Sequence, residues 1–143
     1  MTIVGALTMF FSLIGCLTKP SETIISSASF LIDSKGVEFN LDQPLKRKFN
    51  SGSVRIELVQ EWRPLPPWTS IQLSDGRFAK ITVSLFSEDG KIFTSAILGS
   101  AGGILNARFE PEIPKGASIK KVKITSDVPL TCKRVTWYDF NAE

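Results

Sequence analysis

Carboxylate side chains are the residues of this sequence with the clearest capacity for chemistry. Hydrolysis of a glycoside needs two such acids held at a defined separation. The spacing of the candidates singles out no pair, and no Asp-x-Asp-x-Asp run indicates a calcium loop. A glycan-processing enzyme with paired carboxylates is therefore one alternative, without an assigned catalytic residue, metal ligand or cofactor. The candidate acids are Glu57, Glu61, Asp75, Glu110, Glu112 and Asp139.

Nucleophilic catalysis lacks its usual base in this chain. The sequence contains no histidine, which is the commonest general base and the commonest metal ligand. A serine hydroxyl or the thiol of Cys132 therefore has no imidazole to remove its proton. These observations favour a non-catalytic protein.

The segment from Trp62 to Trp68 reads Trp-Arg-Pro-Leu-Pro-Pro-Trp. Because prolines cannot donate to a sheet ladder, we expect the chain to leave its sheet here and form a stiff loop. Aromatic faces stack on sugars and a planar guanidinium recognises carboxylates, so Arg63 and Trp68 are predicted to bind a ligand. In the alternative, both tryptophans close the core. Trp62 continues the alternate, inward-facing positions of Ile56 and Leu58, which favours a place in the core for Trp62.

Tyr138 is a third candidate for ligand binding. Successive side chains of a strand point to opposite faces. Trp137 shares its parity with Val135 and is predicted to lie in the core, so Tyr138 would face outward with its hydroxyl available to a ligand. The alternative is a tyrosine on an edge strand that binds nothing.

The charge pattern argues against a nucleic-acid-binding protein. The 17 basic and 14 acidic residues give a net charge of +3, and the positive charges are scattered among carboxylates. Lys46-Arg47-Lys48 and Lys120-Lys121 are the only local basic runs and are interpreted as solvated. The glycine-rich stretch Gly99–Gly103 lacks the Gly-Lys-Ser/Thr ending of a phosphate-binding loop and is predicted to be a flexible connection between strands.

The first residues of the chain have the pattern of a signal peptide. Residues 2 to 16 contain no Asp, Glu, Lys or Arg, and an apolar run extends from Ile3 to Leu17. Such a run would span roughly 22 Å as a helix, which is short for a bilayer core of about 30 Å but typical of a signal-peptide core. A short membrane anchor and a buried first strand are the alternatives.

Leu13-Ile14-Gly15-Cys16 resembles the lipobox of bacterial lipoproteins. In that family the chain is cut before the cysteine, whose thiol then carries a diacylglycerol. The resemblance implies that Cys16 is lipidated, which excludes a disulfide between Cys16 and Cys132. It also implies an envelope location, at the outer membrane if the host is Gram-negative, because Leu17 is not the aspartate that favours inner-membrane retention. The Lys or Arg that usually precedes the apolar core is absent, which is consistent with a start farther upstream.

The rest of the sequence predicts an all-β domain. Apolar and polar residues alternate with period two, as in half-buried strands, and Asp75-Gly76 and Asp89-Gly90 suit hairpin turns. We expect eight or nine strands in a two-sheet antiparallel sandwich. The predicted strands lie around 30–32, 37–41, 54–58, 70–73, 79–85, 92–98, 104–109, 122–124 and 135–137.

The closing strands carry a second resemblance. Residues 119–126, a proline turn and Arg134-Val135-Thr136-Trp137 are similar to the last strand pair of galactose-binding-like jelly rolls. The resemblance implies a jelly-roll sandwich and a carbohydrate ligand. We therefore assign residues 1–15 to a signal peptide, 16–28 to a lipid-anchored tether that could include part of a first strand, and 29–143 to the sandwich.

These observations lead to one favoured function and two alternatives. The favoured function is a monomeric, lipid-anchored, non-catalytic envelope sandwich that binds a glycan or a protein partner and no nucleic acid. A scaffold or inhibitor module that docks on another envelope protein is the first alternative. The glycan-processing enzyme is the second.

Overall fold

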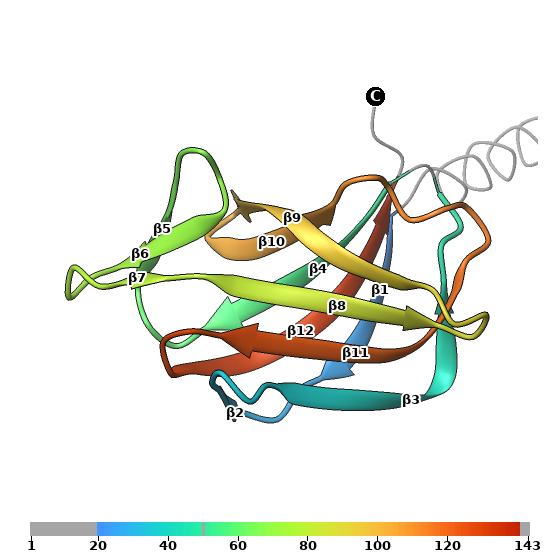
Figure 1. Ribbon diagram of the computed structural model, residues 1–143, viewed down its shortest axis with the longest axis horizontal. Coiled ribbons are helices and arrows are strands. Elements are labelled where there is room, and N and C mark those ends of the chain that lie inside the picture. The colour runs from blue at the N-terminus through green and yellow to red at the C-terminus, as the bar shows by residue number, and fades with distance from the viewer. Residues whose placement is uncertain (1–19, 50, 141–143) are drawn as a thin grey trace, which may run out of the picture.

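The computed structural model describes residues 20–49 and 51–140 as an antiparallel β-structure (Figure 1). No helix among these residues is long and apolar enough to cross a membrane. The described strands are β1 (Ser21–Ser26), β2 (Phe30–Ile32), β3 (Val37–Lys46), β4 (Ser51–Leu58), β5 (Trp62–Leu65), β6 (Ser70–Leu73), β7 (Phe78–Ala79), β8 (Ile81–Ser87), β9 (Ile92–Ala101), β10 (Ile104–Phe109), β11 (Ser118–Ser126) and β12 (Leu130–Phe140).

Eight of the strands form a jelly roll. In chain order they are β1, β3, β4, β8, β9, β10, β11 and β12. The outermost members of this series pair with each other, and so do the members of each successive inner pair, which gives the pairs β1·β12, β3·β11, β4·β10 and β8·β9. This ribbon wraps so that β12 also pairs with β4, and β11 with β8. The order is that of two Greek keys. It confirms the all-β, jelly-roll-like sandwich predicted from the sequence, whereas the twelve strands of the described residues exceed the eight or nine that the sequence predicts, because short strands such as β2, β5 and β7 lie outside the jelly roll.

Strand β9 connects the two sheets. Its first residues, Ile92–Thr94, pair with β8, whereas its later residues, Ser95–Ala101, pair with β10. The sheet order is therefore continuous from β1 to β3. Because β1 and β3 end this order, the sandwich stays open along one seam, between these two strands.

The core fills the space between the sheets with the apolar members of each alternating strand. Val54, Val83, Leu85 and Val122 are fully buried. Their polar neighbours in the sequence face outward, as the period-two pattern predicts. Cys132 is buried in the same core as a free thiol.

The segment 21–26 is part of the sheet. The sequence assigns residues 16–28 to a tether, with part of a first strand as the open alternative, and here Ser21–Ser26 form β1 along β12. Thr23 lies directly opposite Trp137, so the two share the inner face. The inward positions of this strand near the seam are hydroxyl residues, which explains why composition alone favours a tether.

The proline-rich segment leaves the main sheet but remains a strand. Trp62–Leu65 form β5, at the edge of a small three-stranded sheet with β6 and β7, and an edge strand tolerates Pro64. Trp62 is half-buried and packs against the core, as its parity predicts.

The glycine-rich stretch is more ordered than the sequence suggests. Gly99 lies within β9, and the flexible connection reduces to a two-residue turn at Gly102 and Gly103, with φ of 61° and 82°. Ala101 pairs with Ile104 on either side of that turn. Positive φ at both positions is what a tight hairpin of this kind requires, and glycine adopts it without steric cost.

A substitution at Gly52 tests how closely the sheets pack. A methyl group at Gly52 would overlap the indole ring of Trp137, whereas one at Gly99 would meet no atom within 4 Å. We expect Gly52→Ala to lower the free energy of unfolding by about 1–3 kcal/mol through overpacking, and Gly99→Ala to leave it nearly unchanged. Urea unfolding measures both. Equal stabilities for the two variants would contradict this packing.

Candidate functional site

The β5–β6 hairpin presents Trp68 to solvent on a fixed backbone. Its side chain is 47% exposed, and its φ of 69° lies in the left-handed region, which is uncommon for a bulky residue. Two hydrogen bonds hold this backbone: Trp68 N donates to Leu65 O at 2.6 Å, and Leu98 N of β9 donates to Trp68 O at 2.7 Å. The exposed ring therefore sits on a turn that is anchored to the main sheet.

Arg63 lies in a row of side chains that crosses the small sheet. Arg63 of β5, Gln72 of β6 and Phe78 of β7 are neighbours in register. The Nε and Nη2 atoms of Arg63 donate to Oε1 of Gln72 at 2.9 and 2.5 Å. Beside Arg63 and Gln72 lies a shallow pocket of about 320 Å³, which Glu61 and Trp62 also line. We call Arg63, Trp68, Gln72 and Phe78 the hairpin patch.

Tyr138 belongs to a different surface. Strand β12 lies between β1 and β4, so the expected alternative of an edge-strand tyrosine is wrong. The guanidinium carbon of Arg55 lies 3.5 Å from the centre of the Tyr138 ring, and the ring of Phe140 is 5.2 Å away. Strands β4 and β10 separate β12 from β9, the strand to which Trp68 is bonded. The predicted ligand-binding residues therefore occupy two surfaces.

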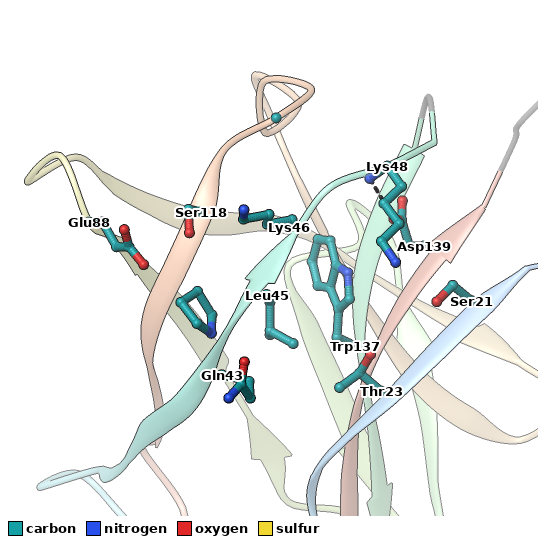
Figure 2. A pocket seen from close by; sticks show the side chains of 12 residues that line it. Ser21, Thr23, Gln43, Leu45, Lys46, Lys48, Glu88, Ser118, Trp137 and Asp139 are labelled. Carbon is teal, nitrogen blue, oxygen red and sulfur yellow. Dashed lines mark hydrogen bonds between the residues drawn. The ribbon is translucent and has the colours of Figure 1, made fainter.

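A pocket of about 620 Å³ opens at the seam between β1 and β3 (Figure 2). The ladder explains why the seam is open here. Leu45 pairs with Ile119 and Asn40 with Lys121, so 41–44 bulge away from β11, and Pro44 within this bulge has no N–H. Nothing in the sequence pattern indicates this pocket, because it depends on the pairing register.

Asp139 forms one wall of this pocket. Its carboxylate is buried and accepts a hydrogen bond from the backbone N–H of Lys48 at 2.6 Å (Figure 2). It also accepts one from the backbone N–H of Phe49 at 3.1 Å. A buried carboxylate needs such donors. The contact ties the end of β12 to the connection between β3 and β4, so we interpret Asp139 as a structural residue.

A second pocket of about 440 Å³ continues the first along the same end of the sandwich. The two share Glu88, Gly116 and Ser118. The second pocket adds residues of the β8–β9 turn and of the loop before β11, among them Lys91 and Lys115. We call the two together the end groove.

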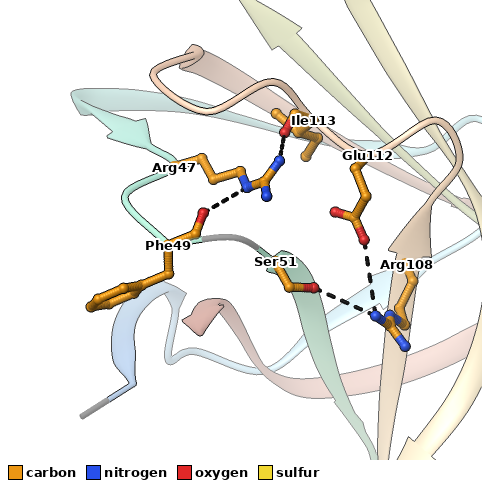
Figure 3. Close-up of polar contacts among 6 residues, drawn as sticks. All are labelled: Arg47, Phe49, Ser51, Arg108, Glu112 and Ile113. Carbon is orange, nitrogen blue, oxygen red and sulfur yellow. Dashed lines mark hydrogen bonds and ion pairs between the residues drawn. The ribbon is translucent and has the colours of Figure 1, made fainter. Parts of the chain in front are cut away.

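Two arginines fasten the loops beside the end groove (Figure 3). Arg47 donates from Nε to Phe49 O at 2.9 Å and from its terminal nitrogen to Ile113 O. Arg108 lies 3.4 Å from the hydroxyl of Ser51 and 3.9 Å from the carboxylate of Glu112. These contacts join the β3–β4 connection to the segment between β10 and β11.

Three of the six candidate acids have other roles in the fold. Asp139 binds backbone amides, and Glu112 pairs with Arg108. Hydrogen bonds from the backbone and then the side chain of Arg77 lower the pKa of Asp75. Within 20–49 and 51–140, no group of three His, Cys, Asp or Glu residues is placed to hold a metal ion.

No protein-family model, curated protein or solved structure matches this chain. The fold and the surfaces define a jelly-roll sandwich with an exposed tryptophan on a hairpin and a groove at one end.

Cys132 provides a test of the core through its titration. Burial raises the pKa of its thiol to about 11. The folded state holds this proton more tightly than the unfolded chain does. The protonated thiol therefore contributes fully to the free energy of unfolding below about pH 9, and this contribution is lost as the pH rises toward 11. We expect alkaline destabilisation that is weaker in Cys132→Ala, measured by urea unfolding from about pH 8 to 11.

The same burial should protect the thiol from reagents. Peptide-level mass spectrometry after thiol labelling at about pH 8 should find Cys132 modified only when the chain is unfolded, because the thiolate is the reactive form. Rapid labelling of Cys132 in the folded chain would contradict the buried placement.

Proposed function

We propose that this chain is a lipid-anchored, non-catalytic binding module that holds a glycan at the hairpin patch. The observation that carries the proposal is the exposed ring of Trp68 on an anchored turn. A non-glycine residue with positive φ is retained when the surrounding structure over-determines it, and such residues cluster at ligand-binding sites. An indole held in this way offers a flat apolar face with little further loss of entropy on binding.

Polar side chains on the strands of the same hairpin support a sugar ligand. Arg63 and Gln72 are planar groups that hydrogen-bond to each other and still have donors to spare, since a guanidinium carries five N–H groups. Glu61 beside them supplies acceptors. A combination of an apolar face with donors and acceptors on one hairpin suits a ring that carries hydroxyl groups.

The membrane address is a proposal that rests on the opening motif. Cys16 lies outside the described residues. The small residue and apolar core before it support diacylglycerol attachment, an envelope location, the outer membrane in a Gram-negative host, and a monomeric module next to the membrane surface. A glycan or protein of the envelope would then be within its reach.

Truncation of Trp68 tests the glycan site. With the full chain in detergent, a glycan array identifies the bound sugar. Trp68→Ala should abolish that binding while changing the free energy of unfolding by less than about 1 kcal/mol, because the ring is half exposed. Ile92→Ala, at another exposed apolar residue, should preserve both binding and stability.

A buried tryptophan provides the matched stability control. Trp137 is 2% exposed, and its truncation to alanine should cost about 3–5 kcal/mol. A comparable loss for Trp68→Ala would mean that the hairpin only closes the core. Binding of envelope proteins in place of sugars would favour the scaffold alternative.

Lipidation of Cys16 is tested separately. Mass spectrometry of the mature protein from a bacterial host should find an acylated N-terminal cysteine that carries diacylglycerol, and Cys16→Ser should release the protein from the membrane fraction, because a lipid anchor needs the thiol. A membrane-bound protein with an intact Met1 terminus would contradict this prediction.

A further inference from the structure

The end groove carries four exposed lysines, and none of them forms an ion pair with another of the described residues, although Lys91 lies close enough to Asp89 to attract its carboxylate. The ion pairs that the described residues form are Arg77–Asp75, Arg108–Glu112 and Lys121–Glu38. None of them involves a lysine of the groove. These lysines come from the end of β3, the β3–β4 connection, the β8–β9 turn and the loop before β11, and they are Lys46, Lys48, Lys91 and Lys115.

Two of the three carboxylates in the groove are already engaged. Asp139 accepts from two backbone amides. Asp89 accepts from the hydroxyl of Ser87 and, at 3.3 Å, from the backbone N–H of Lys91, and these hydrogen bonds lower its pKa. Glu88, on the far side of the first pocket from Asp139 (Figure 2), is the third. The groove therefore holds four lysines and three carboxylates, and Asp89 and Asp139 already accept hydrogen bonds from neighbouring groups.

The remaining lining residues suit sugar hydroxyls more than bases. Ser21, Thr23 and Gln43 supply hydroxyl and amide groups at the seam. Single-stranded nucleic acids are bound by stacking on exposed aromatic side chains, and the aromatic residues of this groove are Trp137, which is buried, and Phe93, which is half-buried. The concave shape also differs from the flat surface that a bilayer presents.

We propose that the end groove binds an acidic glycan, with the four lysines contacting carboxylate or phosphate groups on successive sugars. Ammonium groups bind both kinds of anion as point charges. Pocket volumes of about 620 and 440 Å³ fall in the range of small-ligand sites, and their continuity suits a chain of sugars. The proposal rests on the groove alone and is independent of Trp68.

The test removes the groove charges and compares a matched set elsewhere. The groove variant is K46Q/K48Q/K91Q/K115Q. The control, K35Q/K80Q/K120Q/K133Q, removes the same charge from exposed lysines outside the groove. Calorimetry uses the full chain in neutral detergent with oligogalacturonate for carboxylates, a phosphorylated mannan oligosaccharide for phosphates, and uncharged dextran as the neutral probe.

We expect at least one acidic probe to bind, dextran to bind no more than weakly, and the groove variant to lose at least about tenfold in affinity, because four charge contacts are removed together. The control should change far less. Affinity should fall as salt rises from about 0.05 to 0.5 M, since screening weakens exposed charge pairs. Trp68→Ala should bind the acidic probes as the unchanged protein does. This measurement therefore still tests the groove if the hairpin proposal fails.

Several results would overturn the inference. One is that neither acidic probe binds. Another is that the groove variant and the control lose equal affinity for the acidic probe. The third is groove-dependent binding that is tighter for oligothymidylate or for phosphatidylglycerol vesicles than for either acidic glycan. Circular dichroism and urea unfolding establish that both quadruple variants are folded before binding is compared.

Discussion

The buried carboxylate of Asp139 is the constraint on which one end of this protein depends. Removing a carboxylate from water is costly unless donors replace the water. The donors here are the amides of Lys48 and Phe49, in the connection between β3 and β4. This contact holds the second half of the jelly-roll ribbon against the first, and it fixes the backbone from which Lys46 and Lys48 extend.

Packing next to Asp139 follows from the same geometry. Gly52 lies opposite Asp139 in the β4–β12 ladder, and the indole of Trp137 fills the space that a side chain at Gly52 would need. The core is thus closed by a large ring beside a residue without a side chain, whereas β1 contributes only Ser21 and Thr23 on that side. Small hydroxyl residues on β1 and the bulge in β3 leave the seam unfilled, and the end groove results.

The two candidate binding surfaces differ in their physical character. The hairpin patch carries the exposed ring of Trp68, whose backbone is held by a hydrogen bond from Leu98 of β9, and it suits the apolar face of a sugar. The end groove is concave, polar and lined by four lysines, and it suits anionic groups. Trp68 lies at a hairpin tip and the end groove lies at a bulged edge, so both are where the chain leaves regular pairing.

The sequence by itself determined the fold class and the inward residues, because strand alternation is a local property that hydrophobic periodicity reports directly. Val54, Val83 and Trp137 could be placed in the core from parity alone, and Asp-Gly turns marked the hairpins. The exposure of Trp68 could not be settled, because it depends on the turn that a bond to distant Leu98 fixes. Tertiary structure alone placed Tyr138 on an interior strand, brought Lys46 and Lys115 to the same end groove and buried the carboxylate of Asp139. Each of these depends on which strands pair and in what register, and pairing between residues far apart in the chain leaves no periodic signal in the sequence.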